Sequence, residues 1–429
     1  MLNNLKIYFP DAIFHQISED EIFHGLCHDT RCIQKGDVFL ALKGQYDHGV
    51  HFAHQAYNNG SIAILVDIKH QHLVNGPKII VPDVLKAAYT CASMRRKNYP
   101  FNIAAVTGTA GKTSTKEYLA QIASNEKVFT TYANWNNLLG LIINLSRLND
   151  HVPYNLFELG ISAEGEMQEL VDLLKPDIAL ITTIGHGHLE GLKSLEHVAF
   201  EKQKIAQQAY IRLTTQQALP FLDKSESWKV VDHESFVLSS QFDQTRSLLK
   251  TTLQSNQMIF TVETNGFFHL PSFALAMEVL HVQGMPVYER DRVLRLDVPI
   301  GRGRFIKKGD YLYIDDTYNA NPLSLKSLFF NLQKLEAPSI LVLGDLAELG
   351  SYTEDSLKNF FQVTKSYPLI KCLYYGPHQA MMKSFGFEVM TNENDLIKTI
   401  EASTSKIVAF KGSRVSRLDQ LLQTMIARI

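Results

Sequence analysis

The chain has 429 residues, a formal net charge of −2 and 45% hydrophobic residues. This length exceeds the size at which a single hydrophobic core keeps growing, so two or three domains are expected. The near-neutral charge gives no electrostatic case for nucleic acid or an anionic membrane, and no apolar run reaches the ~18 residues of a membrane span.

The first predicted domain covers residues 1–82. It contains short β-like runs at Asp37–Leu42 and Ile62–Val66 around the helical-looking segment Val50–Asn59. The start of the chain lacks the basic region and long apolar run of a signal peptide. The 4 cysteines form no C-x-x-C pair, which favours reduced thiols in a cytoplasmic protein.

The second predicted domain covers residues 83–297 and opens with a helix-like stretch, Val84–Lys97. Apolar strands then alternate with helical stretches, which indicates a parallel sheet with buried strands. The expected strands are Phe101–Val106, Leu156–Leu159 and Ile178–Ile184. The segment Gln207–Thr264 carries few structural signals.

The third predicted domain covers residues 298–429 and alternates strands with helices again, as a Rossmann-like doubly wound α/β domain does. Its expected strands are Tyr311–Ile314, Ser339–Leu343, Leu369–Tyr375 and Ile407–Phe410. In both α/β domains polar clusters follow the strands. Because such sheets bind ligands at the carboxyl ends of their strands, the clusters predict a cleft between the two domains.

The most informative motif follows the strand ending at Val106. It reads G-x-x-G-K-T from Gly108 to Thr113, and an amphipathic stretch follows. Glycines let backbone N–H groups approach an anion, Lys112 can reach outer phosphates, and Thr113 can bind magnesium. The motif therefore predicts ATP binding, although a strict Walker loop has glycine where Val106 stands. A glycine-rich turn without a nucleotide is the alternative.

Other polar residues have two readings each. Glu158 ends a strand, where a carboxylate can bind magnesium or can form a salt bridge. His186 and His188 form an H-x-H pair, but no further zinc ligands follow at ordinary spacing. Lys202 and Lys204 lie in a helical stretch, and their spacing alone favours a solvated charged face.

Three segments of the third domain can bind anions or sugars. Gly301–Arg304 carries two arginines whose guanidinium forks suit phosphate. Asp315–Pro322 follows a strand, where a carboxylate can take ribose hydroxyls. Lys411–Arg414 follows another strand and suits a substrate carboxylate. The alternatives are a plain linker for Gly301–Arg304, a turn for Asp315–Pro322 and a basic turn for Lys411–Arg414.

Taken together and in order, these segments resemble the Mur ligase family of ATP-dependent ligases. The resemblance covers nearly the whole chain. The segments that carry it are Asp29–Arg31, Gly36–Gly44, Asp47–Gly49, Gly108–Lys116, Asn134–Asn137, Glu158–Gly160, His188–Gly191, Gly301–Arg304, Asp315–Pro322, Leu343–Gly350 and Lys411–Arg414. The segment His269–Ala276 departs from the family's H-N-x-x-N-A-L-A pattern, because Leu270 and Phe273 replace both asparagines.

The resemblance implies roles for individual residues. The implied catalytic residues are Lys112, His188, Lys202 and Arg304. The implied magnesium ligands are Thr113, Glu158, His188 and Lys202, with Lys202 as a carbamate. The implied nucleotide-binding residues are Gly108, Thr109, Ala110, Gly111, Lys112, Thr113, Ser114, Asn136, Asn137, Asp316, Tyr318 and Asn319. The implied substrate-binding residues are Thr30, Arg31, Lys43, Asn321, Lys411, Ser413 and Arg414.

The resemblance also implies an activity. The last domain favours a member that uses ATP and Mg²⁺ to join D-alanyl-D-alanine to UDP-N-acetylmuramoyl-tripeptide through an acyl phosphate, in peptidoglycan precursor synthesis. A monomer without nucleic-acid or membrane partners is expected. One alternative is a sibling ligase that adds a single amino acid, of the diaminopimelate-adding or folylpolyglutamate type. The other alternative is a nucleotide-binding protein without ligase activity.

Overall fold

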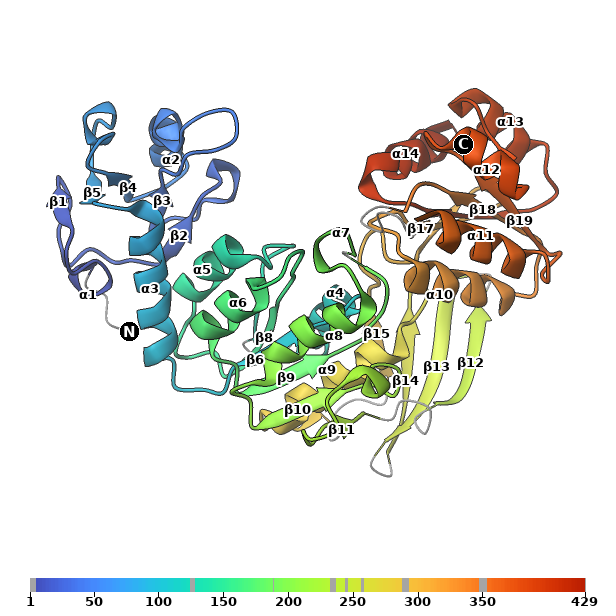
Figure 1. Ribbon diagram of the computed structural model, residues 1–429, viewed down its shortest axis with the longest axis horizontal. Helices are drawn as coiled ribbons and strands as arrows, with labels where there is room; N and C mark the ends of the chain where they lie inside the picture. The colour runs from blue at the N-terminus through green and yellow to red at the C-terminus, as the bar shows by residue number, and fades with distance from the viewer. Residues whose placement is uncertain are drawn as a thin grey trace.

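The computed structural model describes residues 5–123, 128–187, 189–231, 237–243, 246–255, 258–287, 293–346 and 353–428. Within these ranges four β-sheets follow one another along the chain, and helices lie against them (Figure 1). The predicted three-part α/β architecture is confirmed. The domain boundaries after residues 82 and 297 stay predictions. None of the described helices is both long and apolar enough to cross a membrane.

The N-terminal sheet has the strand order β1-β5-β4-β3-β2, with β1 antiparallel to β5 and the other neighbours parallel. The elements are α1 (Leu5–Tyr8), β1 (Ile13–His15), β2 (Gly25–Cys27), β3 (Asp37–Leu40), α2 (Ala53–Asn58), β4 (Ala63–Asp67), β5 (Lys78–Val81) and α3 (Val84–Asn98). The helix expected over Val50–Asn59 is wrong in its first part. His48 accepts a hydrogen bond from the Val50 N–H and starts a 3-10 turn before α2.

The central sheet has the order β11-β10-β9-β6-β8-β7, and all of these neighbours are parallel. The strands are β6 (Ala104–Thr107), β7 (Val128–Thr130), β8 (Tyr154–Glu158), β9 (Ile178–Ile181), β10 (Ile211–Thr214) and β11 (Lys229–Val230). The helices are α4 (Lys112–Ile122), α5 (Leu138–Ser146), α6 (Glu166–Leu174), α7 (Leu189–Leu192), α8 (Leu195–Gln203) and α9 (Leu270–Val282). Strands β6, β8 and β9 are almost wholly buried, as a sheet covered on both faces requires.

A second sheet of the middle region was not predicted. It is formed by β12 (Val237–Asp243), β13 (Leu248–Ser255), β14 (Met258–Thr264) and β15 (Val293–Leu296). Antiparallel pairs join β12 to β13 and β13 to β14, and β15 runs parallel to β14. β12 is mostly exposed, so its sequence lacks the apolar run that identifies a buried strand.

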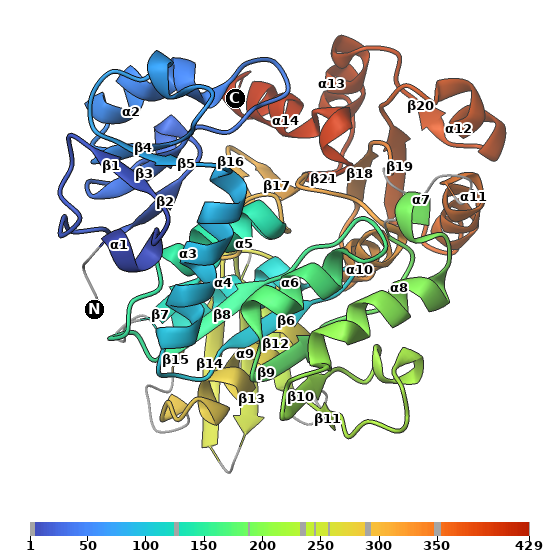
Figure 2. The ribbon, with the colours of Figure 1, turned by 60° about the vertical axis from the view of Figure 1, so that its left-hand side comes forward.

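The C-terminal sheet has the order β16-β17-β21-β18-β19-β20, with β16 antiparallel to β17. The strands are β16 (Arg304–Lys308), β17 (Tyr311–Asp316), β18 (Ser339–Leu343), β19 (Ile370–Tyr374), β20 (Glu388–Val389) and β21 (Ile407–Lys411). The helices are α10 (Pro322–Gln333), α11 (Thr353–Thr364), α12 (Gln379–Phe385), α13 (Glu393–Glu401) and α14 (Leu418–Arg428). In Figure 1 the N-terminal and C-terminal domains lie at opposite ends of the molecule, with the central elements between them. In the turned view of Figure 2 both end domains lie above the central strands β6, β8 and β9.

Candidate active site

The loop between β6 and α4 lies where the strand order of the central sheet reverses, since β6 has β9 on one side and β8 on the other. An open α/β sheet binds ligands at the carboxyl end of such a strand. A Cβ at Gly108 would lie 2.0 Å from Thr182 Oγ1, so only glycine fits there. The first turn of α4 supplies backbone N–H groups and a partial positive charge, which suit an anion.

This loop lines a cavity of about 230 Å³, which we call the phosphate cavity. The predicted residues that line it are Thr109, Ala110, Gly111, Lys112, Thr113, Ser114, Asn136, Glu158, Tyr318, Asn319 and Asn321. Residues from the central and C-terminal domains therefore meet at one site. Asn137 does not line it; instead its side chain caps α5 by accepting a hydrogen bond from the Gly140 N–H at 2.9 Å.

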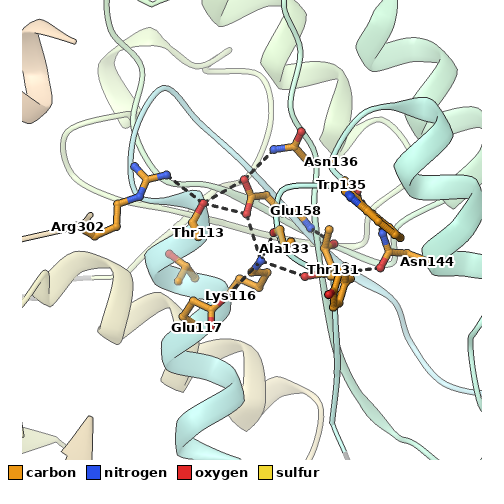
Figure 3. A network of polar contacts seen from close by, with 12 residues as sticks. Thr113, Lys116, Glu117, Thr131, Ala133, Trp135, Asn136, Asn144, Glu158 and Arg302 are labelled. Atoms are coloured by element: carbon orange, nitrogen blue, oxygen red, sulfur yellow. Dashed lines mark hydrogen bonds and ion pairs between the residues drawn. The ribbon is translucent and has the colours of Figure 1, made fainter. Parts of the chain in front are cut away.

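Glu158 is the acidic centre of the phosphate cavity (Figure 3). Its carboxylate is 3% exposed, accepts a hydrogen bond from Thr113 Oγ1 at 3.1 Å and accepts another from Asn136 Nδ2 at 2.9 Å. Mg²⁺ prefers carboxylate, hydroxyl and phosphate oxygens. Thr113 and Glu158 thus offer a donor set that fits magnesium beside a bound phosphate.

Lys112 and Lys202 are two lysines whose charges affect each other. Lys112 Nζ donates to Gly108 O at 2.7 Å. Lys202 is 1% exposed, and among the described residues its Nζ has no hydrogen-bond partner. Burial lowers the pKa of Lys202 well below its usual value, and the charge of Lys112 lowers this pKa further. The solvated face favoured by spacing is therefore wrong for Lys202, because α8 turns this side chain into the core.

Arg302 reaches the phosphate cavity from the C-terminal side. Its guanidinium Cζ lies 3.9 Å from the centre of the Tyr318 ring, and its Nη2 lies 3.4 Å from Thr113 Oγ1. Arg414 lies over the same ring at 4.6 Å. Arg302 Nε is buried without a partner among the described residues.

Arg304 was assigned to phosphate in the sequence, but it lines neither this cavity nor the adjoining one. Gly301 and Gly303 flank Arg302 and have left-handed φ angles of +75° and +91°, so the chain bends on both sides of Arg302. A Cβ at Gly301 would lie 2.9 Å from Tyr318 Cβ, so the turn packs closely against Tyr318. Arg302 therefore lines the phosphate cavity where the sequence had favoured Arg304, and the predicted role of Arg304 stays a prediction.

A larger cavity of about 380 Å³ adjoins the loop and extends between the central domain and α10. Its lining includes Gly111, His269, Asp316 and Lys411. The buried Lys411 forms an ion pair at 2.7 Å with the partly buried Asp316. Burial raises the pKa of Asp316 and lowers the pKa of Lys411, while their mutual attraction opposes both shifts.

The segment that departs from the family pattern lies against the loop as well. His269 Nδ1 lies 2.8 Å from Ser272 Oγ, which donates to Gly111 O at 3.0 Å. The Ser272 side chain is therefore hydrogen-bonded to the backbone of the phosphate loop. The sequence alone did not assign a role to either residue.

The residues predicted to hold the first substrate lie in the N-terminal domain and line neither cavity. Arg31 pairs with Asp29 at 2.6 Å, and Thr30 O accepts a hydrogen bond from Asn59 at 2.8 Å. Lys43 forms a backbone bridge with His48. Their predicted role stays a prediction.

Three further assignments have mixed outcomes. His188 and the segment 347–350 lie outside the described residues. Ser413 is buried, and its Oγ has no partner among the described residues. The resemblance gave no role to Lys116, Asn134 or Arg302, although the sequence pattern had named Arg302 as one of two arginines that suit phosphate. Lys116 also carried a signal, because it follows Thr113 by three positions and Lys112 by four, and residues at these spacings share a helix face.

Comparisons with known proteins show which proteins this chain is similar to. Residues 106–267 match the Mur ligase middle domain. The UDP-N-acetylmuramoyl-tripeptide--D-alanyl-D-alanine ligase of Rickettsia prowazekii is 28% identical, over 92% of this chain and 93% of the relative. The enzyme of the same name from Bacillus subtilis is 27% identical, over 95% of this chain and 94% of the relative.

Solved structures share the fold. A crystal structure of MurF from Acinetobacter baumannii superposes with a TM-score of 0.81 at 22% identity, covering 100% of this chain and 98% of that one. The MurF ligase from Thermotoga maritima in complex with ADP gives 0.77 at 21% identity, covering 94% and 97%. At this identity the likeness concerns the fold alone.

Proposed function

Because the chain belongs to the Mur ligase family, we propose that it is the ATP-dependent ligase that joins D-alanyl-D-alanine to UDP-N-acetylmuramoyl-tripeptide. The observation that carries this proposal is the phosphate cavity, where Thr113 and Glu158 of the central domain face Arg302 and Tyr318. The curated relatives that cover nearly the whole chain carry the name of this activity. We propose that the enzyme acts as a cytoplasmic monomer.

The reaction has two steps. The terminal carboxylate of the tripeptide attacks the γ-phosphorus of ATP, which forms an acyl phosphate and releases ADP. The amine of D-alanyl-D-alanine then attacks the acyl carbon, loses a proton and expels inorganic phosphate as the amide forms. Negative charge gathers on phosphate oxygens in both steps, so preorganised cations lower the barrier.

The residues of the cleft fit these needs. Lys112 and Arg302 supply positive charge on two sides of the phosphate cavity, and the start of α4 supplies N–H donors. Asp316 lines the adjoining cavity, where a carboxylate can accept ribose hydroxyls. Lys411, Ser413 and Arg414 lie at the end of β21, which suits the carboxylate of the incoming dipeptide.

Magnesium would be held by Thr113 and Glu158, with His188 and Lys202 as further proposed ligands. When bound, magnesium would neutralise the charge of the phosphate oxygens. A buried neutral amine such as Lys202 can add CO₂ to form a carbamate, whose oxygens can ligate a cation. The Nζ of Lys202, which has no hydrogen-bond partner within the described ranges, supports this modification.

The test is phosphate release with each substrate omitted in turn. Release is expected only when ATP, the UDP-muramoyl tripeptide and D-alanyl-D-alanine are all present. Release with a single amino acid in place of the dipeptide would favour a sibling ligase. Lys112→Ala and Glu158→Ala should each abolish ligation while the protein stays folded, and near-normal product formation by either variant would contradict the assignment.

A further inference from the structure

A lysine beneath the phosphate loop takes no part in the proposed reaction, yet it is buried. Lys116 lies on α4 and is 1% exposed. It follows Lys112 by four positions and Thr113 by three, so it shares a helix face with the two residues that line the phosphate cavity. A buried charged group is retained only when partners compensate for its lost hydration.

The partners of Lys116 come from three parts of the central domain (Figure 3). Its Nζ donates to Thr131 O at 3.0 Å and to Ala133 O at 2.6 Å. The same Nζ lies 3.3 Å from Glu117 Oε1 and 3.8 Å from Glu158 Oε2. Lys116 therefore connects α4 with the chain after β7 and with the end of β8.

The chain after β7 forms a loop, residues 131–137, that leads into α5. Ala133 adopts a left-handed φ of +46°, which costs free energy for a residue with a Cβ and which its hydrogen bond to Lys116 helps to hold. On the other side Asn144 accepts from the Tyr132 N–H at 2.9 Å and donates to Trp135 O at 3.2 Å.

This loop delivers side chains to the active site. Asn134 and Asn136 line the phosphate cavity, and Asn136 Nδ2 donates to Glu158 Oε1 at 2.9 Å. Thr131 Oγ1 accepts a hydrogen bond from the Glu158 N–H at 2.8 Å. Glu158 is thus held by the same loop that Lys116 fastens to α4.

We propose that Lys116 is a positioning residue that ties α4, loop 131–137 and the end of β8 into one unit, and so holds Glu158 and Asn136 in place at the phosphate cavity. The proposal rests on the proposed function, because it takes Glu158 as a ligand of the magnesium that accompanies ATP. It needs no contact between Lys116 and a substrate.

The first measurement uses the fluorescence of Trp135, which lies in the loop. Trp228→Phe removes the other of the 2 tryptophans and gives the parent protein. Lys116→Met in this parent frees the loop, so quenching of Trp135 by acrylamide should rise at least about twofold. Glu117→Gln removes an exposed partner and leaves both carbonyl contacts, so its quenching should match that of the parent.

The second measurement is binding of Mn²⁺ in the presence of ADP, followed by electron paramagnetic resonance. Lys116→Met should weaken Mn²⁺ binding at least about tenfold, because Glu158 loses its fixed position. Leu119→Val, a buried change on the same helix, is the control for a general loss of stability and should leave Mn²⁺ binding unchanged. Should Lys116→Met not fold, Lys116→Gln replaces it in both measurements.

Parent-like quenching or parent-like Mn²⁺ binding in the Lys116 variant would overturn the proposal, as would a lowered unfolding temperature with no other change. Failure of the parent itself to bind Mn²⁺ with ADP would instead overturn the proposed function. In that case the quenching measurement alone still decides whether Lys116 anchors the loop.

Discussion

Two lysines of different domains are equally buried and differ in their surroundings. Lys202 of the central domain and Lys411 of the C-terminal domain are each 1% exposed. Lys411 pairs with Asp316 at 2.7 Å, whereas Lys202 has no hydrogen-bond partner among the described residues and is repelled by Lys112. Burial alone therefore does not define the role of a lysine. A buried lysine beside a carboxylate stays charged in an ion pair, whereas a buried lysine without such a partner favours the neutral, reactive amine.

The largest expected effect concerns activity at the unpaired lysine. Lys202→Met removes the amine that would carry the carbamate, so phosphate release should fall at least about 100-fold, or ~2.7 kcal/mol of transition-state stabilisation. ADP binding, measured by calorimetry, should remain. Lys224→Met, an exposed change in the same domain, serves as the control. An activity loss below tenfold would remove the distinction between the two lysines.

The next effect concerns stability at the paired lysine. Lys411→Met leaves Asp316, whose side chain is 15% exposed, without this cation, so the free energy of unfolding should fall by about 2–3 kcal/mol in chemical denaturation at pH 7, less than for a fully buried pair. Burial raises the pKa of Asp316, so in the variant the folded state binds this proton more tightly than the unfolded state. Part of the loss should therefore be recovered as pH falls. Adding Asp316→Leu should recover stability at pH 7 as well.

A smaller effect of opposite sign is expected at Lys202. Since the pKa of Lys202 is lowered in the fold, the unfolded chain binds this proton more tightly, and the wild type gains stability as pH rises toward about 10.4. Lys202→Met removes this penalty and should raise the free energy of unfolding at pH 7 by about 1 kcal/mol in CO₂-free buffer. The gain should shrink toward pH 10. Destabilisation at pH 7 would show that Lys202 has a stabilising partner.

The smallest effect concerns the aromatic support of the C-terminal side. Tyr318→Leu removes the ring under Arg302 and Arg414, and a lost cation–π contact of about 1 kcal/mol should raise the KM for ATP roughly fivefold. Tyr318→Phe keeps the ring and should stay close to the wild-type KM. Equal effects of the two changes would assign the role to the hydroxyl instead.

The sequence predicted the parts of the site that follow from local pattern. Buried parallel strands read as apolar runs, and the glycine, lysine and threonine of the phosphate loop lie within one short segment, so β6, α4 and Glu158 were found with their chemistry. The mostly exposed strand β12 has no such run, and it was missed together with the partly buried strands β13 and β14. The resemblance implied a nucleotide-binding role for either Asn136 or Asn137; in the structure Asn136 lines the phosphate cavity and the side chain of Asn137 caps α5.

The amino-acid sequence by itself determined which residues can bind phosphate and magnesium, because that ability depends on residue type and on spacing within a loop or strand end. Only the tertiary structure decided which of them meet. The left-handed glycines of the Gly301–Gly303 turn direct Arg302 rather than Arg304 to the loop, and packing of α8 buries Lys202, whose Nζ has no hydrogen-bond partner in the part of the chain that the structure describes. Both outcomes depend on contacts between segments far apart in the chain, and local pattern does not encode such contacts.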